Sequence, residues 1–101
     1  GSLMQSFRFD LDQKISQHLK LADWISIYWQ DQGWLKQYGV EYTQWMLEFL
    51  VPDIRSKDVK CASEHLEKLK NILVNYSLEK YLDKVPASVK RLAATVKRGS
   101  V

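Results

Sequence analysis

Apolar residues recur every three or four positions through most of this sequence, and this spacing constrains the fold more than any other feature. It is clearest in residues 57–76, where one series contains Val59, Ala62, Leu66, Leu69, Leu73 and Tyr76. Residues at this spacing share one face of an α-helix, because the helix repeats every 3.6 residues. We therefore predict an amphipathic helix over residues 57–76, with Ser56 as its N-cap and Asp58 in its first turn.

The same spacing predicts a helix over residues 11–30. Asp10 and Gln13 have the spacing of a capping box, in which each side chain bonds to a backbone N–H near the helix start. The apolar face of this helix contains Leu11, Ile15, Leu19, Ala22, Ser26 and Trp29. Gly33 follows a polar stretch, and glycine is the residue best suited to the left-handed position after a helix. We expect the chain to turn there.

A second long helix is predicted over residues 34–50, closed by Pro52. Gly39 interrupts its apolar spacing. A glycine inside a helix costs about 1 kcal/mol relative to alanine. Two interpretations remain open: the helix restarts at about Val40, or the missing side chain admits a close neighbour.

The C-terminal part of the chain predicts two shorter helical segments. Ser77 is expected to cap the first of them, and Val85-Pro86 then forces an extended step. A last helix follows over residues 87–98, where Gly99 ends it.

These elements predict an all-α fold, a small bundle of four to five helices. Residues 10–98 are expected to form one helical domain. Residues 1–9 are interpreted as a tag remnant and an N-terminal tail that packs Phe7 and Phe9 onto the bundle. The predicted core comprises Leu11, Ile15, Leu19, Ala22, Trp29, Leu35, Trp45, Phe49, Val59, Ala62, Leu66, Leu69, Leu73 and Leu92.

Composition argues against several classes of protein. The apolar runs are too short to cross a bilayer, so no contact with a membrane is expected. Cys61 is the single cysteine, so the chain needs no oxidising compartment and an intracellular location is favoured, without a distinction between cytoplasm and nucleus.

Catalytic and metal-binding patterns are not evident in the sequence. His18 and His65 stand apart, with no second histidine or a cysteine three or four residues further on, so neither a metal site nor a cofactor is expected. Cys61 and His65 lie one helical turn apart, the only spacing here that resembles a thiolate with its base. A structural or surface role for both histidines, and a half-buried thiol at Cys61, are the favoured interpretations. We therefore expect a protein that is not an enzyme.

Aromatic residues cluster in the first half of the chain. Eight of the twelve lie between positions 24 and 49, and each large ring buries on the order of 150–250 Å². They either fill the core of the bundle or remain partly exposed, and exposed tryptophan and tyrosine side chains are typical anchors of protein interfaces. For the second case the candidate anchors are Trp24, Tyr28, Trp34 and Tyr38. The partner would be a helix of another protein or a second copy of this chain.

Positive charge is concentrated at the C-terminal end, although the net charge of the whole chain is only +3. No acidic residue follows Asp83. The alternative function is therefore an accessory nucleic-acid-binding domain, because basic side chains release the counterions condensed on nucleic acid. Its candidate residues are Lys90, Arg91, Lys97 and Arg98. A solvated basic helix end is the ordinary explanation of the same pattern.

Overall fold

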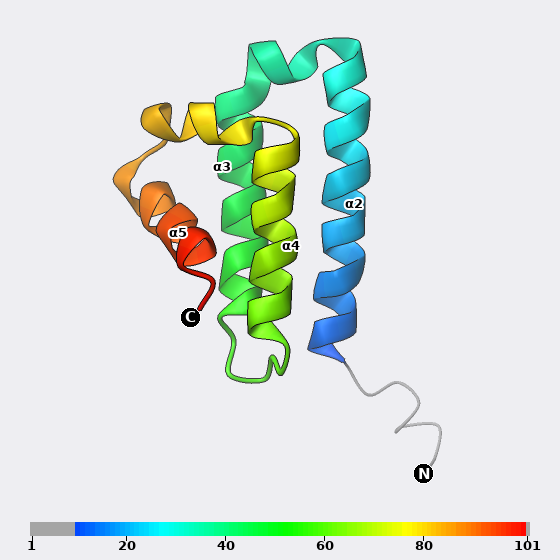
Figure 1. Ribbon diagram of the computed structural model, residues 1–101, viewed down its shortest axis with the longest axis vertical. Helices are drawn as coiled ribbons and strands as arrows, with labels where there is room; N and C mark the ends of the chain where they lie inside the picture. The colour runs from blue at the N-terminus through cyan, green and yellow to red at the C-terminus, as the bar shows by residue number, and fades with distance from the viewer. Residues whose placement is uncertain (1–9, 101) are drawn as a thin grey trace.

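The computed structural model describes residues 10–100, which form a bundle of helices with no strand in that range (Figure 1). Its elements are α2 (Leu11–Gln32), α3 (Trp34–Ile54), α4 (Ala62–Asn75), the 3-10 helix η1 (Leu78–Lys84) and α5 (Ala87–Arg98). The small all-α bundle predicted from the sequence is confirmed. The predicted tail of residues 1–9, with Phe7 and Phe9, lies outside the described residues.

The two longest helices, α2 and α3, form an antiparallel pair (Figure 1). Asp10 caps α2 as predicted, because its carboxylate accepts a hydrogen bond from the backbone N–H of Gln13 at 3.3 Å. The helix runs two residues further than expected, to Gln32. Gly33 then adopts the left-handed conformation, with φ of 76°, and its N–H donates to carbonyl oxygens of the last turn.

Helix α3 is the central element of the bundle. It contacts α2, α4, η1 and α5, and α5 lies on its far side from α2 (Figure 1). The prediction that Pro52 closes this helix at residue 50 was wrong, because α3 continues to Ile54. Pro52 has no backbone N–H, so it cannot donate a hydrogen bond to the carbonyl oxygen of Glu48. Both residues are exposed, so water can bond to that carbonyl instead.

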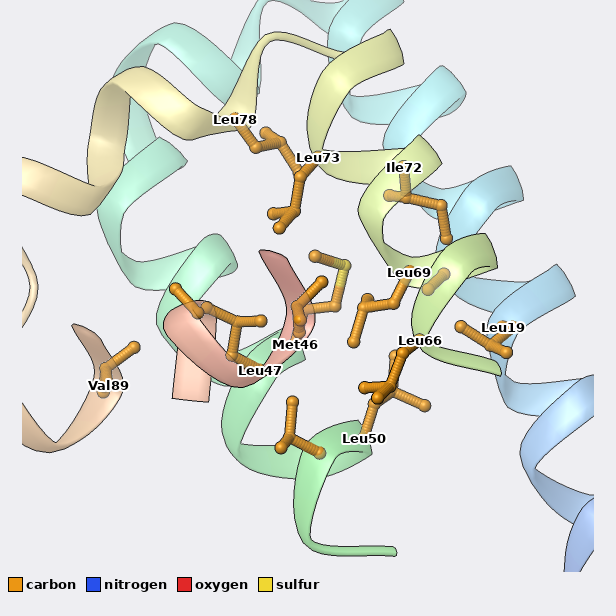
Figure 2. Close-up of a cluster of buried hydrophobic side chains, with 14 of the residues drawn as sticks. Leu19, Met46, Leu47, Leu50, Leu66, Leu69, Ile72, Leu73, Leu78 and Val89 are labelled. Carbon is orange, nitrogen blue, oxygen red and sulfur yellow. The ribbon is translucent and has the colours of Figure 1, made fainter. Parts of the chain in front are cut away.

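The hydrophobic core lies where α3 and α4 meet. Figure 2 shows Met46 and Leu50 of α3 beside Leu66 and Leu69 of α4. Leu78 of η1 and Val89 of α5 close the same cluster. Half of the fourteen predicted core residues are buried in the core, namely Ile15, Leu19, Ala22, Leu35, Leu66, Leu69 and Leu73. Others are partly buried at its margin, namely Leu11, Trp29, Val59, Ala62 and Leu92.

Two predicted core residues are in fact on the surface. Trp45 is 46% exposed and Phe49 is 39% exposed, while Met46 and Leu50, each next in the sequence, take the interior positions. The spacing of apolar residues allowed either member of each pair to face inward. The contacts of α3 with α4 and α5 decide in favour of Met46 and Leu50, because these side chains fill the space between the helices.

Both interpretations of Gly39 that the sequence left open hold in the structure. The helix is kinked at Tyr38, whose φ of −120° and ψ of 21° are not helical. The ring of Tyr81, from η1, lies against Gly39 so closely that a Cβ atom there would overlap it. Gly39 therefore lets η1 approach the backbone of α3.

The third helix begins at Ala62, five residues later than predicted, and the Ser56 hydroxyl does not cap it. That hydroxyl accepts only a 3.4 Å bond from the N–H of Asp58 in the connection before the helix. The cap comes instead from Asp12 of α2. Its carboxylate accepts hydrogen bonds from the N–H of Lys60 at 3.0 Å and of Cys61 at 2.9 Å. A carboxylate at a helix N-terminus is favourable because it bonds free N–H groups and faces the positive end of the helix dipole.

Ser77 is also not the side-chain cap predicted for the following segment. It adopts a left-handed conformation, with φ of 56°, and makes no capping hydrogen bond to η1. Its N–H donates to the carbonyl of Val74, so the residue serves to turn the chain out of α4.

Candidate protein-interaction surface

Seven large apolar side chains are exposed together along the pair α2 and α3, and we call this surface the aromatic strip. Its members are Leu21, Trp24, Tyr28, Trp34, Tyr38, Trp45 and Phe49. Their exposed fractions run from 39% for Trp34 and Phe49 to 65% for Trp24. An exposed apolar residue is ordinary when it stands alone, but a contiguous patch of this kind is typical of a binding surface.

The strip lies on the side of α2 that α4 does not cover. Asp12 bonds to the start of α4, and Asp23 accepts a hydrogen bond from the Tyr76 hydroxyl at 2.7 Å. Leu21 and Tyr28 fall on the other side of α2, because they are separated from Asp12 and Asp23 by about half a helical turn. The strip is therefore not covered by the other helices of the bundle.

The rings of the strip form one series of contacts, which passes through Trp29 and the buried Tyr42 between them. Trp24 stacks on Tyr28 with ring centres 6.3 Å apart, and Tyr28 meets the edge of Trp34 at 5.6 Å. Further along α3, Trp45 stacks on Phe49 at 5.4 Å. These mutual contacts restrict the rotamers of large side chains before any partner arrives, which lowers the entropy lost on binding.

An apolar groove of about 630 Å³ opens between the two helices within this strip. Glu41 is the one charged residue in its lining. The walls and floor are Trp24, Ile25, Tyr28, Trp29, Tyr38, Tyr42 and Trp45. A groove of this size and lining accepts apolar side chains, and it lacks the convergent polar groups that orient a small-molecule substrate.

Hydrogen bonds fix the floor of the groove. The hydroxyl of Tyr42 donates to the carbonyl oxygen of Ala22 at 2.9 Å and lies 2.7 Å from the hydroxyl of Ser26. Burial raises the pKa of Tyr42, which keeps the phenol protonated. The Trp29 ring packs on Tyr42 with centres 5.1 Å apart. The groove is therefore a preformed feature of the pair α2 and α3.

The structure brings together the four aromatic anchors singled out in the sequence. Trp24, Tyr28, Trp34 and Tyr38 are all exposed and all belong to the aromatic strip. Sequence reasoning missed Trp45 as a surface residue. Once Trp34 and Tyr38 are known to be exposed, spacing places Trp45 with them, since the three follow one edge of α3 at intervals of four and seven residues.

The four basic residues singled out for nucleic acid are also brought together. Lys90, Arg91, Lys97 and Arg98 are exposed on one face of α5, opposite its buried residues. The ammonium of Lys97 lies 4.0 Å from the carboxylate of Glu79, a weak exposed contact. This basic face contains no apolar side chain larger than alanine.

Cys61 and His65 lie at the start of α4. The thiol is exposed, which corrects the expectation that it is half-buried. The His65 ring is buried, and its Nε2 lies 2.9 Å from the carboxylate of Asp12. The same carboxylate accepts the N–H groups of Lys60 and Cys61, and these bonds, followed by those with His65, hold the pKa of Asp12 below its usual value.

Neither a metal-binding cluster nor a membrane-spanning helix is found among the described residues. Within residues 10–100, no group of three or more histidine, cysteine, aspartate or glutamate side chains is placed to hold a metal ion. None of the helices in that range is both long enough and apolar enough to cross a membrane.

Comparison with known proteins gives no relative. The sequence matches no protein-family model, and neither the curated proteins nor the solved structures contain a match.

Proposed function

We propose that this chain is a non-catalytic protein-interaction module that binds a helix of another protein, or a second copy of itself, through the aromatic strip. The observation that carries the proposal is the exposure of seven large apolar side chains around one apolar groove. Covering such a surface is favourable, because each square ångström of apolar area removed from water contributes about 25 cal/mol.

The dimensions of the strip support a helical partner. From Trp34 to Phe49 the strip follows 16 residues of α3, or about 22 Å for the 15 steps at 1.5 Å each. A partner helix of about four turns matches this length. Such a helix presents apolar side chains every three or four residues, and these can enter a groove between two helices.

The proposal is tested by comparing two single substitutions at exposed apolar positions. Trp45→Ala lies in the strip, whereas Val74→Ala lies on α4, outside it, and Val74 is 52% exposed. Each variant and the unmodified chain are immobilised, and proteins retained from the native source are identified and then tested for direct binding as purified proteins. We expect direct binding that is lost with Trp45→Ala and kept with Val74→Ala. Equal binding by both variants would reject the strip as the binding surface.

Self-association is the other form of the same proposal. Sedimentation measured over a range of concentrations detects it, because a dimer formed through the strip dissociates on dilution and is abolished by Trp45→Ala. A chain that is monomeric and binds no protein, with its exposed tryptophans open to a soluble quencher in every condition, would remove the proposal.

A second candidate function, binding of nucleic acid, is favoured by one specific observation. The four basic side chains on α5 form a single face, and an anionic backbone can contact them together. Replacing Lys90, Arg91, Lys97 and Arg98 by glutamine should then weaken binding to a duplex and reduce its dependence on salt. Binding that is absent, or unaffected by salt, would discard this candidate.

A further inference from the structure

Acidic residues lie along the edges of the aromatic strip, and the α3 edge carries no positive charge. The α2 edge runs through Gln17, Leu21, Trp24, Tyr28 and Asp31 at intervals of three or four residues. The α3 edge runs through Trp34, Tyr38, Glu41, Trp45 and Glu48 at the same intervals. Asp31, Glu41 and Glu48 are all exposed, and no lysine or arginine belongs to either series.

Helices α2 and α3 contain three lysines and no arginine. Lys14 forms an ion pair with Asp53 at 3.8 Å, and Lys20, one turn before Trp24, lines a hollow between α2 and α4. Lys36 is exposed on α3, about half a helical turn from Trp34. Among residues 10–100, neither Glu41 nor Glu48 forms an ion pair. Glu41 and Glu48 are therefore not neutralised by an ion pair within the described residues.

From this arrangement we infer that the occupant of the aromatic strip is a basic amphipathic helix of another protein, with cations beside its apolar stripe that meet Glu41 and Glu48. This inference rests on the function proposed above and specifies the partner. Glu41 and Glu48 are seven residues apart on α3, a separation of about 10.5 Å along the helix axis. A partner helix packed nearly parallel or antiparallel to α3 matches it with lysine or arginine residues seven positions apart.

The same charges argue against a second copy as the occupant. Two strips placed face to face would bring four carboxylates, Glu41 and Glu48 of each copy, to the margins of one interface, and the α3 edge supplies no cation. Like charges at an interface disfavour association. The basic face of α5 has the cations but offers only alanine as an apolar contact, so it cannot fill the groove of another copy.

Three synthetic helical peptides of 18 residues provide the probe. They share one apolar stripe of leucines and differ at two flanking positions seven residues apart, which are lysine, glutamine or glutamate. Binding to the full chain is followed by the fluorescence of its tryptophans. At low salt we expect the lysine peptide to bind roughly five- to tenfold more tightly than the glutamate peptide, because two partly exposed ion pairs contribute a few-fold each. The preference should shrink as salt is added.

Variants assign the preference to the acidic edge. In the double variant Glu41→Gln, Glu48→Gln the three peptides should bind almost equally. The matched control is Glu64→Gln, Glu67→Gln on the outer side of α4, where both residues are exposed, and there the preference should remain.

The possible results separate the two proposals. Equal binding of all three peptides, or a preference that survives the Glu41 and Glu48 changes, would overturn the basic partner while leaving helix binding intact. A dimer formed through the strip that excludes the peptides would overturn it in favour of a second copy. No binding of any peptide, with monomeric protein, would reject both the basic partner and the helix-binding function.

Discussion

The ring of Tyr81 lies directly on the backbone of Gly39, in the space that any larger side chain would occupy. This contact joins η1 to the middle of α3, one residue after the kink at Tyr38. It explains why a residue with poor helix propensity stands in the central helix of the bundle. The lost propensity is offset by the packing of an aromatic ring.

Gly39→Ala should destabilise the chain, although alanine is the better helix former by about 1 kcal/mol. The new methyl group overlaps the Tyr81 ring, so η1 must move away from α3 or the ring must rotate into a less favourable position. Urea unfolding followed by circular dichroism measures the change in the free energy of unfolding.

The control for this prediction is the same change made in a Tyr81→Ala background. Once the ring is absent, Gly39→Ala meets no obstacle from it and should become neutral or stabilising. The double-mutant cycle should therefore give a coupling energy between Gly39 and Tyr81 that differs from zero, the value for independent sites. If Gly39→Ala destabilises equally in both backgrounds, the contact with Tyr81 is not the reason for the glycine.

The caps and spacing of α2 show how much of this fold was accessible from sequence. Asp10 and Gly33 bound the helix through interactions that reach only a few residues, so local sequence was enough to predict them. The start of α4 was not predictable in this way. Its cap, Asp12, lies 49 positions before Cys61, and only the packing of α2 beside α4 brings the two together.

The candidate site was predicted in part for a similar reason. The aromatic cluster was visible, and its four expected anchors are exposed. The surface position of Trp45 was not predictable, because α3 is apolar on most of its circumference and spacing alone does not show which side its neighbours cover. Packing of α3 against α4 and α5 buries Met46 and leaves Trp45 exposed.

Asp12→Asn should remove a pH-dependent contribution to stability. Hydrogen bonds from Lys60 and Cys61 hold the pKa of Asp12 below its usual 3.8, so the charged form is favoured in the folded chain. This contribution is fully present above the ordinary pKa and is lost as the pH falls through the lowered one. The difference in unfolding free energy between the two proteins should therefore be largest near neutral pH and shrink below about pH 4.

Urea unfolding at a series of pH values tests this expectation. Asp58→Asn is the matched control, because Asp58 lies in the same connection, is exposed, and its carboxylate makes no hydrogen bond to α4. Asp58→Asn should cost less stability than Asp12→Asn at neutral pH, because it removes no cap of α4. A difference for Asp12→Asn that stays constant down to pH 2 would contradict the capping role.

The raised pKa of Tyr76 predicts that the folded chain loses stability in alkaline solution. Burial, together with the hydrogen bond that its hydroxyl donates to Asp23, raises its pKa to about 12. In the unfolded chain the phenol ionises near pH 10, so above that pH the unfolded state binds fewer protons and gains relative stability. The stabilising effect is thus complete below about pH 10 and is lost as the pH rises toward 12.

Comparison with Tyr76→Phe isolates this effect, because phenylalanine keeps the ring and removes the ionising group. Its stability should fall less steeply than that of the unmodified chain between pH 10 and pH 12. Tyr28→Phe, at an exposed position in the strip, serves as the control for the removal of a phenol hydroxyl. Equal slopes for all three proteins would show that Tyr76 titrates normally.

Leu66→Ala and Trp45→Ala should have opposite consequences for stability and binding. Leu66 is fully buried against α3, so its truncation leaves a cavity and should cost roughly 2–5 kcal/mol. Trp45 is 46% exposed and loses mainly its stacking with neighbouring rings, so its truncation should cost about 1–2 kcal/mol. Thermal unfolding measures both changes, and the lysine peptide measures binding under conditions where each variant is folded. Folded Leu66→Ala should bind normally and Trp45→Ala weakly, because Leu66 supports the bundle whereas Trp45 faces the partner. If Trp45→Ala unfolds the chain as readily as Leu66→Ala, the ring belongs to the core and the strip loses its central residue.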